Sequence, residues 1–95
     1  VSRYPAAVMD LAFVVDEAVP AAALRTALTE AGGDLLERLS LFDEFRGDSI
    51  GEHHKSLAWS VTLRAADRTL SDDEVTAARA ALVAAGESLG AALRS

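Results

Sequence analysis

The chain has 95 residues, no cysteine and a formal net charge of −6, and 51% of its residues are hydrophobic while only 5% are aromatic. This length and composition fit one folded domain with a modest core, and they exclude disulfide bonds and thiolate metal sites. There is no apolar run of the roughly 20 residues that span a bilayer and no signal-peptide pattern at the start, so we expect a cytoplasmic protein without a membrane partner.

Residues 7–33 predict a strand followed by a helix. Alternating apolar side chains over residues 7–15 are typical of a buried strand. Pro20 suits the first turn of a helix, because its missing N–H would have no partner there. An apolar stripe at helical spacing runs over residues 24–31, and the glycine pair at 32–33 ends the helix.

Two further strands are predicted around a loop that contains Gly47 and Gly51. Simple alternation over residues 35–46 places Leu39, Leu41, Asp43 and Phe45 on one face of the second strand. The third strand, residues 55–64, alternates most regularly. Its apolar set, which includes Trp59, should face the core, and its small polar set should face outward. One face of the sheet is therefore expected to remain open to a partner.

A second helix is predicted from Ser71 and Glu74, which have the spacing of a capping box. We expect Gly86 and Gly90 to loosen its end, and residues 91–94 to form a short last strand. The order strand, helix, strand, strand, helix, strand is that of α+β ferredoxin-like folds. The predicted fold is thus βαββαβ, a four-stranded antiparallel sheet with two helices on one face.

No catalytic, metal or cofactor site is predicted in this chain. The glycines and lysine within residues 47–55 lack the spacing of a phosphate-binding P-loop, and that segment joins two strands. His53 and His54 are adjacent and point in opposite directions on an extended segment, so we interpret them as solvated loop residues. The acidic run at 72–74 is interpreted as the start of a helix, where negative charge favours the helix dipole.

Four short blocks of sequence carry a resemblance to a known family. They are Tyr-Pro at 4–5, Leu-Phe-Asp-Glu-Phe-Arg-Gly at 41–47, Lys-Ser-Leu-Ala at 55–58, and Arg-Thr-Leu followed by acidic residues at 68–74. Together they resemble the C-terminal anticodon-binding domains of the bacterial phenylalanyl-tRNA synthetase β subunit, over nearly the whole chain. We therefore expect residues 1–95 to be one domain of a longer subunit.

The resemblance implies a function and a set of partners. The domain would bind the anticodon stem-loop of phenylalanine tRNA, while aminoacylation with ATP and magnesium occurs elsewhere in an α2β2 enzyme that includes the α subunit. The domain itself would need no cofactor, and in isolation it would be a monomer. Recognition would rest on stacking and hydrogen bonds to unpaired bases.

The resemblance also implies four RNA-binding residues. Phe45 stands where the family has a tyrosine that stacks on an anticodon base, and phenylalanine keeps the π face. Ser56 matches a serine that hydrogen-bonds the anticodon, Asp43 could accept from a base edge, and Lys55 could reach a phosphate. Other interpretations remain open, because composition alone favours a buried Phe45 and the two charged residues could form surface ion pairs.

Two observations count against this assignment. The net charge of −6 repels RNA, so a larger assembly would have to supply most of the attraction, and Met9 replaces an arginine of the family. The leading alternative is a small-ligand-binding regulatory or oligomerisation module on the same fold. A third is an acylphosphatase-like enzyme, which would need an arginine-bearing phosphate loop where Asp16 and Glu17 stand.

Overall fold

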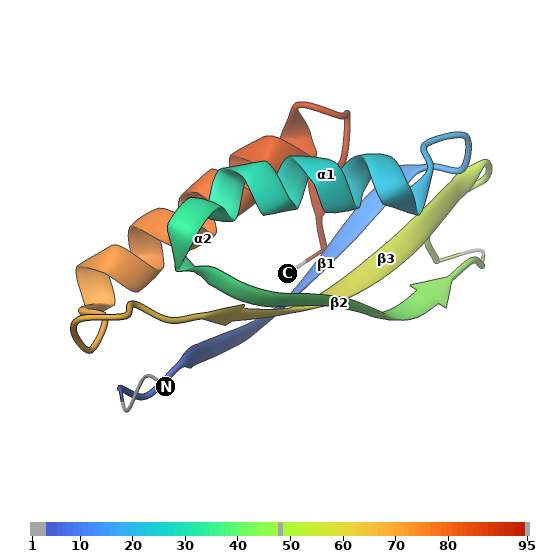
Figure 1. Ribbon diagram of the computed structural model, residues 1–95. Coiled ribbons are helices and arrows are strands. Elements are labelled where there is room, and N and C mark those ends of the chain that lie inside the picture. Colours follow the sequence, from blue (N-terminus) through green and yellow to red (C-terminus); the bar gives the residue numbers. More distant parts are fainter. Residues whose placement is uncertain (1–3, 48, 95) are drawn as a thin grey trace.

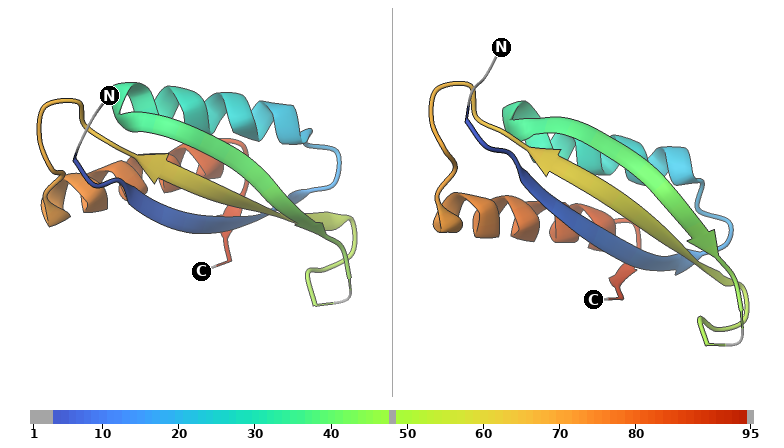
Figure 2. Two further views of the ribbon diagram at one scale, coloured as in Figure 1. Left: turned by 60° about the horizontal axis from the view of Figure 1, so that its bottom comes forward. Right: turned by 90° about the horizontal axis from the view of Figure 1, so that it is seen from below.

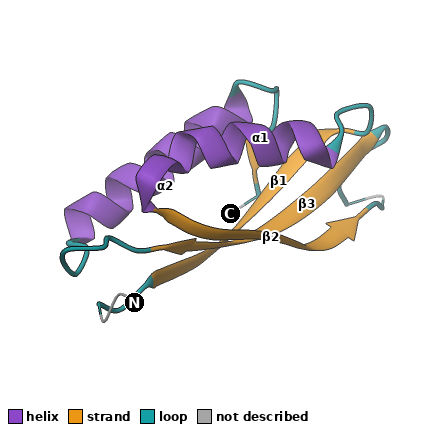
Figure 3. Cartoon of the chain, in the orientation of Figure 1, coloured by secondary structure: helices purple, strands orange, loops and turns teal. Residues whose placement is uncertain are grey.

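Residues 4–47 and 49–94, the part of the chain that the computed structural model describes, form a four-stranded antiparallel sheet and two α-helices (Figure 1). The strand order is β2-β3-β1-β4, and both helices lie on the same face of the sheet (Figure 3). The predicted ferredoxin-like α+β fold is confirmed. The elements are β1 (Ala7–Asp16), α1 (Ala21–Gly32), the short 3-10 helix η1 (Gly33–Leu35), β2 (Leu36–Phe45), β3 (His54–Leu63), α2 (Asp72–Glu87) and β4 (Ala92–Leu93).

The hydrophobic core lies between the sheet and the two helices. Trp59 is fully buried, as the alternation along the third strand predicts. Arg25 of α1 covers its ring, with the guanidinium carbon 5.1 Å from the ring centroid. Val75, at the first turn of α2, is only partly buried, although it stands at helical spacing from the buried Leu82 of the same helix. The large side chains that are fully buried are Leu11, Phe13, Val15, Leu24, Leu28, Leu57, Trp59, Val61, Leu63 and Leu82.

Both helices begin and end where the sequence predicts, to within one or two residues. Pro20 is the residue before α1, and Gly33 ends that helix with a φ of 55°, a region that glycine adopts without strain. The capping box at the start of α2 is present: the Ser71 hydroxyl accepts a hydrogen bond from the Glu74 N–H, and the Glu74 carboxylate accepts one from the Ser71 N–H, both at 3.1 Å. None of the described helices is long and apolar enough to cross a membrane.

Gly86 lies inside α2 and brings the helix against the sheet. It is the last residue but one of the helix, which ends at Glu87, where the sequence predicts its end. A Cβ atom at position 86 would lie 2.4 Å from Cε1 of Phe13. The absence of a side chain therefore allows α2 to approach the Phe13 ring closely.

The other face of the sheet is left uncovered by the described helices (Figure 2). Side chains of paired residues on neighbouring strands point to the same face of a sheet. The outward set of β3 is Ser56, Ala58, Ser60 and Thr62, and its partners on β1 are Val14, Ala12, Asp10 and Val8. We call this uncovered surface the open face, and these residues of β1 and β3 form its central part.

Candidate nucleic-acid interface

A β-bulge in β2 decides which face of the sheet Phe45 occupies. Before the bulge, Leu41 lies opposite the buried Trp59, and after it Phe45 lies opposite Ser56 of the outward set. Phe42 is the additional residue in the bulge, and one additional residue reverses the alternation of faces. The expectation that Leu41 and Phe45 share a face is therefore wrong, and Phe45 belongs to the open face rather than the core.

The Phe45 ring is held at the end of the open face by two contacts. Its side chain is 44% exposed. A Cβ atom on Gly47 would lie 3.0 Å from the ring's Cζ, so the ring rests against the glycine backbone. The guanidinium carbon of Arg94 lies 5.9 Å from the ring centroid. A solvent-accessible aromatic ring with a neighbouring cation is thus available for stacking.

Ser56 lies at the centre of the row that Phe45 begins. Across the sheet this row runs through Phe45, Ser56, Val14 and Ala92. The predicted outward direction of Ser56 agrees with this register, yet the residue is only 4% exposed. Phe45 and Arg94 come from opposite edges of the sheet and approach each other, so their side chains extend over the strands between them. This arrangement accounts for the low exposure of Ser56.

Asp43 lies one row further along the same face and is exposed. The row contains Asp43, Ala58 and Ala12, and the backbone N–H of Arg94 donates a 2.7 Å hydrogen bond to the Ala12 carbonyl oxygen. Because the two alanines have small side chains, the long side chain of Arg94 has room to lie over them. The structure therefore brings Phe45, Ser56 and Asp43 to one surface.

Lys55 does not join that surface. It pairs with Val15 on β1, has the same parity as the core residue Leu57, and is 6% exposed. Its side chain therefore leaves β3 on the face that the helices cover. Of the four residues that the family resemblance implies, three share the open face and Lys55 does not.

The pattern-based interpretation missed Arg94. In the sequence it is marked only by its position next to a two-residue strand. That it lies near the other residues of the open face follows only from the register of β4 against β1. The same face also carries Arg38, opposite Thr62, and Asp10, opposite Ser60. With Asp43 added, the charges that the register places on the open face are mixed rather than basic, so they do not offset the net acidity of the chain.

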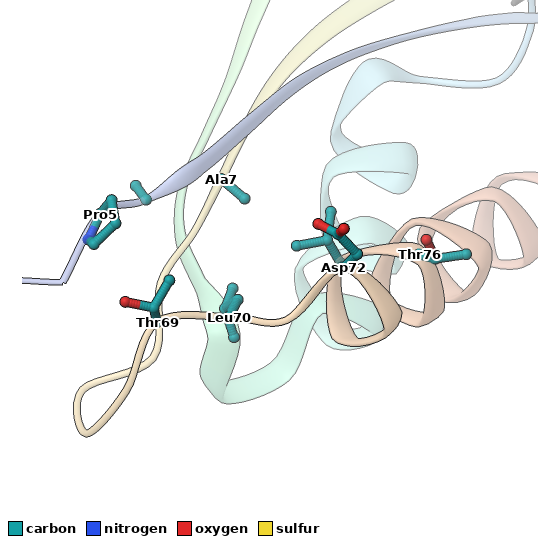
Figure 4. A pocket seen from close by; sticks show the side chains of 8 residues that line it. Pro5, Ala7, Thr69, Leu70, Asp72 and Thr76 are labelled. Carbon is teal, nitrogen blue, oxygen red and sulfur yellow. The ribbon is translucent and has the colours of Figure 1, made fainter.

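A groove of about 420 Å³ lies at the end of the sheet away from Phe45 (Figure 4). In Figure 4, Pro5 and Ala7 line one side, and the segment before α2 with the first turn of that helix lines the other. Val75 lines this groove, which explains its partial exposure. The full lining is Pro5, Ala6, Ala7, Thr69, Leu70, Asp72, Val75 and Thr76.

A second groove, of about 470 Å³, lies beside the loop that follows Phe45, and Glu17 and His53 are among its lining residues. The Nδ1 atom of His53 is 3.4 Å from a carboxylate oxygen of Glu17. Within residues 4–47 and 49–94, no three His, Cys, Asp or Glu side chains are close enough together to hold a metal ion. The absence of a cofactor in this domain remains a prediction.

The Arg-Thr-Leu block of the family resemblance stabilises the start of α2. The Arg68 guanidinium contacts the Glu74 carboxylate at 2.5 Å and the Asp67 carboxylate at 2.7 Å. Hydrogen bonds from the Arg68 side chain, and next from the Ser71 N–H, lower the pKa of Glu74 from its ordinary 4.5 to about 2. This block therefore has a structural role, at a distance from the open face.

Comparison with known proteins gives one consistent family. The sequence model described as the ferredoxin-fold anticodon binding domain matches residues 2–94. The phenylalanine–tRNA ligase β subunit of Thermobifida fusca is 50% identical over 95 residues, which are 99% of this chain and 11% of that protein. That of Mycolicibacterium paratuberculosis is 50% identical over 96 residues, 100% of this chain and 12% of that protein. That of Symbiobacterium thermophilum is 47% identical over 95 residues, 100% of this chain and 11% of that protein. The chain thus spans only 11% to 12% of the length of these relatives.

Proposed function

Because the chain belongs to the ferredoxin-fold anticodon-binding family, we propose that the open face of its sheet binds the anticodon loop of phenylalanine tRNA. In this proposal the domain is a non-catalytic part of the β subunit of phenylalanine–tRNA ligase. The observation that supports it best is the position of Phe45. The β-bulge turns an aromatic side chain away from the core and leaves it 44% exposed on an uncovered sheet face.

The mechanism is recognition of unpaired bases. A base that stacks on an aromatic side chain contributes about 1–3 kcal/mol of binding free energy. In our proposal the Phe45 ring stacks on one anticodon base, the Ser56 hydroxyl forms a hydrogen bond to it, and the Asp43 carboxylate accepts from a neighbouring base edge. Ser56 becomes accessible when Phe45 and Arg94 move apart to admit the base. We assign no base contact to Lys55, because its side chain leaves the sheet on the helix-covered face.

The acidity of the domain implies that it works inside a larger assembly. Phosphate neutralisation supplies much of the affinity in most RNA complexes, and a chain of net charge −6 with mixed charges on its open face supplies little of it. We propose that the remainder of a cytoplasmic α2β2 ligase attracts the tRNA and carries out the ATP- and magnesium-dependent reaction. The domain then contributes local contacts without a metal or cofactor.

A gel-shift experiment on the complete ligase tests this function. The complete ligase and a form that lacks this domain are each titrated against phenylalanine tRNA and an unrelated tRNA, at low and moderate salt. We expect removal of the domain to weaken binding of phenylalanine tRNA more than binding of the unrelated tRNA. Equal affinities of the two ligase forms for phenylalanine tRNA would contradict the proposal and favour a regulatory or oligomerisation module.

A further inference from the structure

Arg94 reaches the candidate RNA site from the opposite edge of the sheet. Its backbone is fixed beside β1 by the hydrogen bond to Ala12, 2.7 Å long. From there its side chain reaches to within 5.9 Å of the Phe45 ring centroid, and Phe45 lies at the end of the edge strand β2. The guanidinium therefore lies above the open face, directly beside the ring that we propose to stack on a base.

The charge of Arg94 is not neutralised by a carboxylate in the described part of the chain. Arg46, Arg64 and Arg68 each form an ion pair with an acidic side chain at 2.5 to 3.0 Å. None of the ion pairs among residues 4–47 and 49–94 involves Arg94, although the residue is exposed. Its nearest interaction partner is the π face of Phe45, which leaves its N–H donors available to an anion.

On the basis of the proposed function, we infer that Arg94 binds a backbone phosphate of the nucleotide whose base stacks on Phe45. A guanidinium presents a planar fork of N–H donors that matches two phosphate oxygens, and it also stacks on aromatic rings. In the free protein Arg94 rests against Phe45. When the base arrives, the guanidinium leaves the ring and pairs with the phosphate, which gives an acidic domain a local cation at the point of contact.

The salt dependence of tRNA binding distinguishes a phosphate contact from a structural role. Each phosphate that a protein neutralises on single-stranded nucleic acid changes the slope of log K against log salt concentration by about 0.7. In the complete ligase, Arg94→Gln should weaken binding of phenylalanine tRNA at low salt and make this slope shallower by about 0.7. Arg94→Lys keeps the charge and should keep the slope of the unmodified ligase.

Two further variants make the test decisive. Arg79→Gln makes the same charge change at an exposed position on α2, a helix that covers the other face of the sheet, and should alter neither affinity nor slope. Phe45→Ala, measured in parallel, tests the proposed function itself. If Phe45→Ala weakens binding while Arg94→Gln leaves affinity or slope unchanged, the role of Arg94 is wrong and the proposed function stands. If neither variant weakens binding, the proposed function is wrong as well.

Discussion

Gly47 lies against the Phe45 ring so closely that a Cβ atom at position 47 would be 3.0 Å from the ring's Cζ. The glycine thereby sets the orientation of the aromatic side chain that the β-bulge has turned to the open face. This contact joins two residues of one sequence block, and it gives a physical reason for the spacing of the aromatic residue and the glycine in that block.

Gly47→Ala should disturb binding through Phe45. The added methyl group forces the ring to move, and because the ring is 44% exposed it can do so without unfolding the domain. We expect weaker binding of phenylalanine tRNA by the complete ligase and little change in melting temperature. In a Phe45→Ala background the same substitution should have no further effect, since coupled residues give non-additive changes. Equal effects in both backgrounds would contradict the coupling.

Gly86→Ala should destabilise the chain, although alanine normally stabilises a helix by about 0.5–1 kcal/mol relative to glycine. A methyl group at position 86 would overlap the Phe13 ring, at 2.4 Å from its Cε1 atom. Overpacking of this kind costs about 1–3 kcal/mol. Denaturant unfolding measures the free-energy change, and a Phe13→Leu background should reduce the loss. An increase in stability would show that the helix does not approach the sheet as described.

Glu74 should make stability depend on pH in the acidic range. Its pKa is lowered to about 2 in the folded chain, chiefly by the hydrogen bond from Arg68, and is ordinarily 4.5. The carboxylate therefore stabilises the fold fully above pH 4.5, and this contribution is lost as the pH falls from 4.5 to about 2.

We expect the difference in unfolding free energy between the unmodified chain and Glu74→Gln to be largest above pH 4.5 and to shrink toward pH 2. Arg68→Gln removes the principal cause of the lowered pKa and should flatten the pH dependence. A difference between the unmodified chain and Glu74→Gln that stays constant over this range would show that the ion pair does not form in solution.

The sequence could predict most of the fold because its signals are local. Alternation along residues 55–64 correctly places Trp59 in the core, and the pair Ser71 and Glu74 correctly marks the start of α2. The face that Phe45 occupies could not be predicted from alternation, since the bulge at Phe42 depends on how β2 pairs with β3. The family resemblance indicates that Phe45 binds RNA, whereas simple alternation of side chains places it with Leu41 on the face that the helices cover.

The sequence indicates which residues belong to the candidate site better than it indicates which of them lie next to each other. Arg94 is near the end of the chain and Phe45 near its middle, so their proximity exists only in the folded sheet. Lys55 and Ser56 are neighbours in sequence, yet successive residues of a strand point to opposite faces. A shared sequence block therefore did not imply a shared surface, and the register of the strands decided which of its residues lie beside Phe45.

The most direct test of the central claim is the affinity of the complete ligase for phenylalanine tRNA when Phe45 is replaced. Phe45→Ala and Phe45→Leu both remove the π face and should weaken binding by about 1–3 kcal/mol, or about 5- to 150-fold. Phe45→Tyr keeps the ring and should bind nearly as the unmodified ligase does. All three should leave the melting temperature almost unchanged, because Phe45 is outside the core. A sharp fall in melting temperature with unchanged tRNA affinity for Phe45→Ala would contradict the claim that this residue stacks on an anticodon base.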